Sequence, residues 1–306
     1  MLYNNYMKKT APVCVIGGPS IDIFGTASQK IVPEDSNIGQ ISFAFGGVGR
    51  NIANNLAKLG IDVELVCVTG NDDYAEKIIE HCKKEGIGLN YSESVDQPTA
   101  TYLSINQPEG DIYVSINDME INKCLNIDFL SQRLDFINSC PIVVMDTNLS
   151  AETLAFMLQN VRSKIYFDPV SSVKAALMPK DLTNISVLKP NVIEAETILH
   201  KKGNIEELVN GLLYKGIKEV YLTLGKNGAY SANEKEHCQL PIYPGEVINT
   251  TGCGDAFLAG VIYGDLHNQD LFTKTKYGLA AASISCRSLG SNNEYLNETE
   301  LLKTAR

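Results

Sequence analysis

The sequence predicts one large α/β domain, with a mostly parallel central sheet flanked by helices and a small antiparallel β-lid. Short apolar runs that end in glycine alternate with amphipathic, helix-like stretches along most of the 306 residues. This order is typical of a doubly wound parallel sheet. Two other stretches alternate apolar and polar residues, as antiparallel strands do. Hydrophobic residues form 44% of the chain, which is enough for a sizeable core.

The N-terminal half contains two strand–helix pairs. The segment "GRNIANNLAKLG" places Ile52, Leu56 and Leu59 on one helical face and ends at Gly60, a common helix stop. The helix after it is acidic at its start and lysine-rich at its end, which suits the helix dipole. The predicted strands are residues 12–18 and 63–70, and the predicted helices are residues 49–60 and 72–86.

The alternation continues in the C-terminal half, so we assign residues 12–306 to one domain. The predicted strands are 141–146, 164–170, 185–191 and 218–225, and the predicted helices are 151–161, 192–200, 205–216, 255–266 and 271–290. Residues 31–45 and 99–117 interrupt the pattern, with "PEGD" as a hairpin turn, and we expect them to form the discontinuous β-lid. Residues 1–11 lack the apolar core of a signal peptide, so we expect a disordered N-terminal extension.

Charge and cysteine content exclude several classes of protein. The net charge is −10, which argues against a nucleic-acid-binding protein but leaves room for a single nucleoside or nucleotide. No run reaches the roughly 20 apolar residues that a membrane span needs. None of the eight cysteines forms a C-x-x-C pair, and several lie in apolar runs. We therefore expect reduced, mostly buried thiols in a cytoplasmic protein.

The segment "VINTTGCGDAF" (247–257) indicates chemistry. A helix that begins near Cys253 or Gly254 directs free N–H groups and partial positive charge at an anion, and glycines let a phosphate approach closely. Asp255 follows at once, and a carboxylate there would repel a phosphate. It makes sense as a general base that takes a proton from an attacking alcohol. The alternative is an ordinary glycine turn before an acidic helix start.

Two further motifs bear on a nucleotide site. In "KPNVIEAE" (189–196), Asn191 and Glu194 share one face of a helical turn and can hold Mg²⁺ and its waters; they can equally be a helix cap. In "TLGKNG" (223–228), a strand ends at a glycine turn where Thr223 and Gly225 can meet phosphates or ribose. A Walker A motif and a complete G-x-G-x-x-G are both missing from the sequence, which argues against a dinucleotide-dependent dehydrogenase.

Four signatures, in order along the chain, resemble those of the ribokinase family of carbohydrate and nucleoside kinases, also called PfkB-type. They are "GGPSID", "FGGVGRNIANNLAKLG", "KPNVIEAE" and "TTGCGDAF". The resemblance implies a ribokinase-like fold, ATP as phosphoryl donor and Mg²⁺ as cofactor. Many relatives have aspartate where this chain has Asn249. Asparagine keeps an oxygen ligand but loses the charge, which weakens the case for bound K⁺.

The resemblance also implies roles for individual residues. In catalysis, Asp255 would act as the base, and Gly252, Cys253 and Gly254 would surround the anion hole. At the acceptor sugar the resemblance implies Asp22, Gly46, Gly47 and Asn51. Four further polar residues have side chains that suit the mixed donors and acceptors of a uracil-like edge, although each can equally be a turn or cap residue: Ser20, Asn117, Asp118 and Asn148. Nucleotide binding falls to Lys189, Thr223, Gly225, Gly228, Thr251, Gly252, Gly254 and Ala281. Asn191 and Glu194 would hold Mg²⁺ through water.

Several passages are similar to the pseudouridine kinase subfamily, namely "DSNIG", "SINDM", "DTNLS" and "DPVS". This implies pseudouridine as the acceptor. Pseudouridine keeps an N1–H that uridine lacks, and an acceptor facing it would discriminate strongly; Asp118 is our candidate. Ribose, adenosine and uridine remain alternative acceptors, and a non-catalytic nucleoside sensor is an alternative function. Exposed lid strands can also pair in a homodimer.

Overall fold

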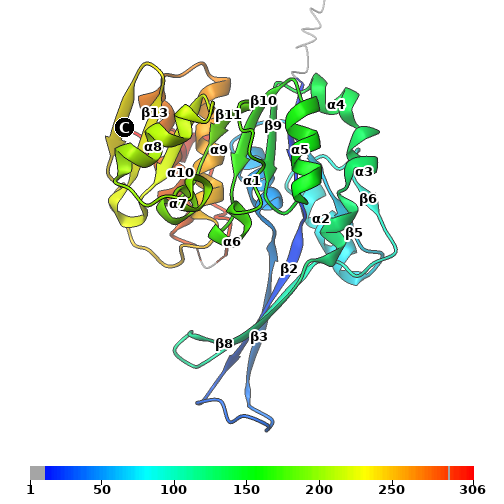
Figure 1. Cartoon of the computed structure of the whole chain (residues 1–306). Coiled ribbons are helices and arrows are strands. Elements are labelled where there is room, and N and C mark those ends of the chain that lie inside the picture. The colour runs from blue at the N-terminus through cyan, green and yellow to red at the C-terminus, as the bar shows by residue number, and fades with distance from the viewer. Residues whose placement is uncertain (1–10, 289) are drawn as a thin grey trace, which may run out of the picture.

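The computed structural model describes residues 11–288 and 290–306. It consists of a body, in which helices cover both faces of a large sheet, and a long four-stranded lid that projects from the body (Figure 1). Two separate buried apolar clusters lie on the two faces of the large sheet. The predicted extension 1–11 lies, apart from Ala11, outside the described residues.

The body is built on an eight-stranded sheet of order β14-β13-β12-β11-β10-β9-β1-β4. Neighbours from β4 to β12 are parallel, and β12, β13 and β14 are antiparallel. The parallel strands are apolar runs buried on both faces, as sheets between two helical layers require. The strands are β1 Val13–Ile16, β4 Val63–Val66, β9 Ile142–Asp146, β10 Lys164–Asp168, β11 Ile185–Leu188, β12 Glu219–Thr223, β13 Ala229–Asn233 and β14 His237–Leu240.

Helices cover both faces of this sheet. One layer holds α1 Val48–Lys58, α2 Asp73–Lys84, α9 Cys253–Leu266, α10 Leu271–Ser285 and α11 Glu298–Thr304. The other layer holds α3 Ile127–Ser131, α4 Leu134–Ser139, α5 Ala151–Asn160, α6 Ser172–Ala175, α7 Val192–Leu199 and α8 Ile205–Tyr214. Helix α9 is buried on nearly every side, which explains its lack of a polar face. A buried helix gives the acidic residue in its first turn a rigid support.

The lid is a second sheet of order β3-β2-β7-β8. Its strands are β2 Ser20–Ala27, β3 Gly39–Gly46, β7 Thr101–Asn106 and β8 Ile112–Asp118. Hairpins β2–β3 and β7–β8 are antiparallel, and a parallel pairing of β2 with β7 joins them. The sequence predicted three of these strands and missed β2, and residues 31–38 form a loop before β3.

A short two-stranded sheet and two 3₁₀ turns complete the described fold. The predicted strand 63–70 is interrupted at Cys67, after which β5 Val68–Thr69 pairs with β6 Glu93–Ser94. Two 3₁₀ turns lie at Glu120–Cys124 and Gly225–Asn227. Among the helices of residues 11–288 and 290–306, none has the length and apolar character that a bilayer crossing demands.

Candidate active site

A cavity of about 510 Å³ lies where the lid meets the carboxyl ends of the parallel strands. Asp168 ends β10, Lys189 follows β11 and Thr223 ends β12, and all three line this cavity. Ligands of open α/β sheets bind at this edge, because the strand ends and the loops after them converge there. Gly252, Gly254 and Asp255 line the same cavity from the start of α9.

Asp255 lies in the first turn of α9, and only 7% of its surface is exposed. Burial raises the pKa of its carboxyl to about 7, and the charge of Asp168 adds to the rise. Lys189 and a hydrogen bond from Asn51 act in the opposite direction; the Asn51 Nδ2 donates to Asp255 Oδ2 over 2.8 Å. A carboxyl with its pKa near neutrality is well matched to accept a proton from an alcohol.

The start of α9 has the features of an anion site. Gly252 has φ 79°, and a Cβ on it would lie 2.0 Å from the Ser291 carbonyl oxygen, so only glycine fits there. No side chain caps this helix. The Cys253 N–H is used by the turn, where it donates to the Thr250 carbonyl over 3.2 Å. The Gly254 and Asp255 N–H groups lie in the first turn, where intrahelical acceptors are absent, and can serve an anion.

A buried cation lies beside this helix start. Lys189 Nζ forms an ion pair with Asp168 Oδ2 at 3.0 Å, and it lies 3.0 Å from the position that a Cβ on Gly254 would take. Burial acts to lower the pKa of Lys189, but the charges of Asp168, Asp255 and Glu194 outweigh it and raise that pKa. The ammonium group therefore stays charged next to the N–H groups, where a phosphoryl group would gain negative charge.

The lid provides one polar wall of the cavity. Asp22, Tyr102 and Asn117 stand next to one another across β2, β7 and β8, and all three line the cavity. Ser20, at the start of β2, donates to Asp22 Oδ1 over 2.9 Å. Gly47 also lines the cavity; its φ of 91° and its contact with the Gly18 carbonyl leave no room for a side chain.

Two predicted acceptor residues lie elsewhere. Asp118 lines a different cavity, together with Asp72 and Lys77. Successive side chains of a strand point to opposite faces, so Asn117 and Asp118 do not face the same cavity, and the structure places Asn117, not Asp118, at the cavity beneath the lid. Gly46 is not part of the cavity lining; it packs against the Asp22 carboxylate, which a Cβ on Gly46 would overlap. Its role is to let Asp22 approach.

The body provides the opposite wall, with two residues that the sequence analysis missed. Asn148 lines the cavity as predicted, and its side-chain oxygen accepts a hydrogen bond from Lys174 Nζ at the short helix α6. Lys174 and Asp168 also line the cavity. Asp168 was visible as the acid at the end of an apolar strand in "DPVS", but Lys174 carries no sequence signal because the short helix α6 approaches the site only in the folded chain.

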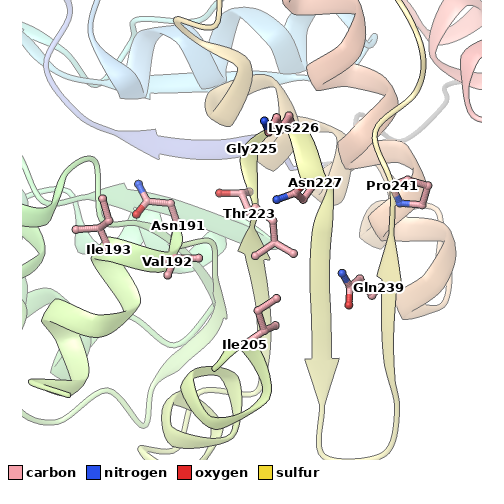
Figure 2. Close-up of a pocket in the computed structure, with 11 residues that line it drawn as sticks. Asn191, Val192, Ile193, Ile205, Thr223, Gly225, Lys226, Asn227, Gln239 and Pro241 are labelled. Carbon is pink, nitrogen blue, oxygen red and sulfur yellow. The ribbon is translucent and has the colours of Figure 1, made fainter. Parts of the chain in front are cut away.

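A second set of hollows lies beyond Thr223. One cavity of about 380 Å³ combines Thr223, Gly225, Gly228 and Gly254 with apolar side chains from the α9–α10 side. A neighbouring cavity of about 780 Å³ shares Thr223 and Gly225 and continues past Lys226 and Asn227 (Figure 2). The smaller cavity, the apolar slot, opens beside the start of α9 and has the size that a nucleoside requires.

The remaining predicted nucleotide residues are distributed differently. Lys189 and Thr251 line the lid-side cavity, which is the cavity where the lid meets the carboxyl ends of the parallel strands. Ala281 was misplaced, because it is fully buried in the core, and the neighbouring Ala282 lines the apolar slot instead. The cause is helix geometry, since a shift of one residue along α10 turns the side chain by about 100°.

Asn191 and Glu194 form a capping box at the start of α7. Asn191 Oδ1 accepts from the Glu194 N–H over 2.9 Å, and Glu194 Oε2 accepts from the Asn191 N–H over 2.8 Å. This is the helix-cap alternative of the sequence analysis. Both residues also line the lid-side cavity, and burial raises the pKa of Glu194. Within the described residues, no cluster of three or more His, Cys, Asp or Glu forms a metal cage.

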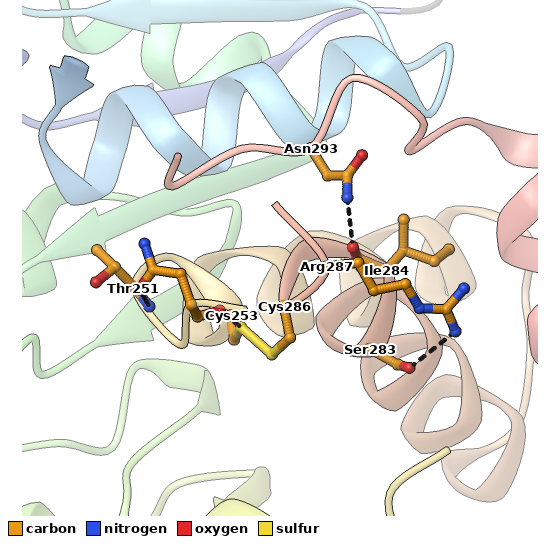
Figure 3. Close-up of a disulfide and its surroundings, with 8 residues drawn as sticks. Thr251, Cys253, Ser283, Ile284, Cys286, Arg287 and Asn293 are labelled. Atoms are coloured by element: carbon orange, nitrogen blue, oxygen red, sulfur yellow. Dashed lines mark hydrogen bonds between the residues drawn. A yellow bond between two sulfur atoms is a disulfide. The ribbon is translucent and has the colours of Figure 1, made fainter. Parts of the chain in front are cut away.

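One expectation about the cysteines was wrong. A disulfide joins Cys253, at the start of α9, to Cys286, at the end of α10 (Figure 3). Their Cα atoms lie 5.9 Å apart, and both residues line the apolar slot. The other six cysteines are free thiols, and four of them are buried. The pairing was missed because its partners lie 33 positions apart in the sequence, and only the antiparallel packing of α9 and α10 brings them together.

Comparisons with known proteins identify the family. The family model described as pfkB family carbohydrate kinase matches residues 10–298. The chain belongs to the pfkB family. The pseudouridine kinase of Escherichia coli (strain K12) is 31% identical over 303 residues, which cover 96% of this chain and 95% of that protein.

Solved structures agree with this family assignment. A putative sugar kinase from Clostridium perfringens superimposes with a TM-score of 0.88 and is 27% identical, over 97% of this chain and 96% of its own. Arabidopsis thaliana ribokinase, complexed with ribose and ATP, has a TM-score of 0.84 at 21% identity, over 97% and 99% of the chains, and it shares the ribokinase-like fold. As a pfkB-family protein, the chain is a phosphotransferase that acts on an alcohol group, in a family that uses ATP and, in general, Mg²⁺.

Proposed function

We propose that this kinase transfers the γ-phosphoryl group of ATP to the 5′-hydroxyl of pseudouridine and forms pseudouridine 5′-phosphate and ADP. The observation that carries the proposal is the buried carboxylate of Asp255 in the first turn of an uncapped helix, in a cavity whose other wall is polar. The choice of pseudouridine rests on the 31% identical relative and on the amide-rich lining of the cavity.

In the proposed reaction, Asp255 takes the proton of the 5′-hydroxyl while that oxygen forms a bond to the γ-phosphorus. The bond from phosphorus to the bridging oxygen of ADP breaks at the same centre, so ADP leaves with the electron pair. The N–H groups of Gly254 and Asp255 and the ammonium of Lys189 stabilise the charge on the phosphoryl oxygens. The lid excludes water, which would otherwise accept the phosphoryl group.

The acidic lining fits a hydrated Mg²⁺. Mg²⁺ prefers oxygen ligands and keeps several waters, so one or two carboxylates suffice. The capping box uses Oε2 of Glu194, and its second carboxylate oxygen would hold the ion through water. Bound Mg²⁺ would neutralise part of the phosphate charge. Asn191 would contribute by keeping Glu194 in position, because its own side-chain oxygen is occupied by the helix cap.

Recognition of the base is assigned to the amide side chains in the cavity. The N1–H of pseudouridine needs an acceptor, and the side-chain oxygen of Asn117 supplies one. With uridine, the bound nucleoside would cover that acceptor without giving it a partner, which is a strong source of discrimination. Asp22, supported by Ser20, is placed to accept from ribose hydroxyls.

The test is ATP-dependent phosphorylation of pseudouridine, uridine, ribose and adenosine in parallel. We expect kcat/KM for pseudouridine to exceed that for uridine by at least about 100-fold. Asn117→Ala should reduce this ratio, whereas Asn54→Ala, a buried amide outside the cavity, should leave it unchanged. Ribose or adenosine as the best acceptor would contradict the proposed specificity. Tight nucleoside binding without any transfer would favour a sensor.

We further propose that two copies pair through their lids. Large apolar side chains are exposed on the lid at Ile41, Phe43, Ile112, Val114 and Ile116. By the two-residue period of strands, Ile41 and Phe43 lie on the face opposite to Asp22. Light scattering should give twice the mass of the 306-residue chain, and Ile41→Glu should halve it, whereas Tyr214→Glu, an exposed residue of α8, should not. A monomeric wild type would contradict the pairing.

A further inference from the structure

Arg50 is a buried arginine for which the proposed reaction gives no role. It lies near the start of α1, and only 2% of its surface is exposed. Its Nε donates to the Gly46 carbonyl over 3.2 Å, and its guanidinium also donates to the Phe45 carbonyl. These two carbonyls end the lid strand β3, so Arg50 ties the base of the lid to the body.

The same guanidinium determines the orientation of the Asn51 amide. One Arg50 nitrogen donates to Asn51 Oδ1 over 2.5 Å, and the Ser291 hydroxyl donates to the same oxygen over 3.0 Å. A guanidinium has only donors, so the amide must turn its oxygen toward Arg50. Its Nδ2 then faces the other way and donates to Asp255 Oδ2.

Arg50 also binds the C-terminal segment that supports the anion site. Its second terminal nitrogen donates to Asn292 Oδ1 over 2.8 Å, and Asn292 Nδ2 donates to the Asn51 carbonyl over 3.1 Å. The carbonyl of the preceding residue, Ser291, packs against Gly252. The Arg50 side chain therefore contacts the end of lid strand β3, the Asn51 amide that donates to Asp255, and the C-terminal segment that packs against the start of α9.

We propose that Arg50 is a positioning residue, which orients the Asn51 amide so that one oxygen of Asp255 is held by a hydrogen bond and the other is left to take the acceptor proton. This inference rests on the proposed role of Asp255 as the base. Arg50 touches neither substrate in the proposed reaction, and acts through Asn51. Its charge persists at neutral pH, because burial lowers its pKa only to about 10.

Arg50→Lys is the informative variant. Lysine keeps the charge but cannot donate in several directions from one plane, so the Asn51 amide loses its fixed orientation. The hydrogen bond from Asn51 lowers the pKa of Asp255, and its loss should raise that pKa by about one unit. The other charged groups that face Asp255, namely Asp168 on β10, Asp146 on β9 and Lys189 after β11, are left intact.

The pKa can be measured without turnover, by ¹³C NMR titration of labelled aspartates, with the Asp255 resonance identified by its absence from Asp255→Asn. We expect Arg50→Lys to raise the Asp255 titration midpoint by about one pH unit. In kinetics at pH 7, a shift of the pKa from about 7 to about 8 lowers the ionised fraction of Asp255 about fivefold, so we expect a kcat at least about fivefold lower, with the KM for ATP within threefold. Asn54→Ala is the matched control, since Asn54 lies in the same helix, is 1% exposed and donates to Glu85; it should leave the midpoint unchanged.

A double-mutant cycle decides whether the effect passes through Asn51. In an Asn51→Ala background, Arg50→Lys should shift the Asp255 midpoint by less than 0.3 unit, since no amide remains to be oriented. An unchanged midpoint in Arg50→Lys, an equal shift in Asn54→Ala, or an additive shift in the double variant would each overturn the inference. Failure of the proposed reaction would show separately, as a wild type that titrates as described but phosphorylates none of the four acceptors.

Discussion

The raised pKa of Asp255 has a consequence for stability that Asp255→Asn should expose. The carboxyl titrates at about 7 in the folded chain, against an ordinary value of 3.8. Between these values the folded state keeps a proton that the unfolded state has lost, so the free energy of unfolding falls as pH rises. A difference of about three units corresponds to about 4 kcal/mol at most. Asparagine does not titrate, and the variant avoids this loss.

The assay is urea denaturation of the wild type and Asp255→Asn at intervals from pH 4 to pH 9. The stability of the variant relative to the wild type should rise from pH 4 by up to about 1.4 kcal/mol per pH unit and level off above pH 7. Asp72→Asn is the contrasting control: burial acts to raise the pKa of Asp72, but hydrogen bonds from Thr99 and Ala75 outweigh it and lower that pKa. Its pH-dependent contribution to stability therefore lies below the ordinary pKa of 3.8, and the stability difference between Asp72→Asn and the wild type should stay nearly constant from pH 4 to pH 9. A stability difference for Asp255→Asn that stays constant with pH would refute the reasoning.

Four further predictions follow from the site. The kcat of the wild type should fall tenfold per pH unit below about pH 7, because Asp255 accepts a proton only when ionised; a flat profile down to pH 5 would argue for another base. Gly252→Ala should destabilise the fold by about 1–3 kcal/mol through its left-handed backbone alone, with a clash against the Ser291 carbonyl added, as measured by denaturation. A reductant should lower the stability of the wild type by about 3–4 kcal/mol, as expected for a disulfide that closes a loop of 33 residues, and should leave Cys286→Ser unaffected. Replacing K⁺ by Na⁺ or choline should change kcat less than twofold, because Asn249 brings no charge to the cation position; a tenfold loss would show that K⁺ binds regardless.

Most of the body follows from patterns that depend on local sequence. Buried parallel strands are continuous apolar runs, and the helices between them have an apolar stripe and clear ends, so both were recognisable. The lid strand β2 was missed because it follows β1 after only three residues, and the glycines between them were interpreted as one turn. The hairpin β13–β14 was missed because its strands are short and partly polar.

The candidate site was predictable where a motif specifies backbone geometry. The glycines and acid of "TTGCGDAF" predicted a helix start with Asp255 in its first turn, and α9 begins there. Residues that depend on tertiary packing were not predictable. Whether Asn117 or Asp118 faces the cavity depends on the register of β8 against β7, and Lys174 reaches Asn148 across 26 positions of sequence.

The central claim is that Asp255 removes the proton from the acceptor alcohol while the helix start holds the phosphoryl group. The most direct measurement is a single-turnover reaction of ATP with pseudouridine, with wild type and Asp255→Asn in parallel and pseudouridine binding measured for both by calorimetry. We predict that the wild type forms pseudouridine 5′-phosphate and that the variant does so at least about 100-fold more slowly, with binding changed less than threefold. Transfer by the variant at a rate within threefold of the wild type would contradict the claim.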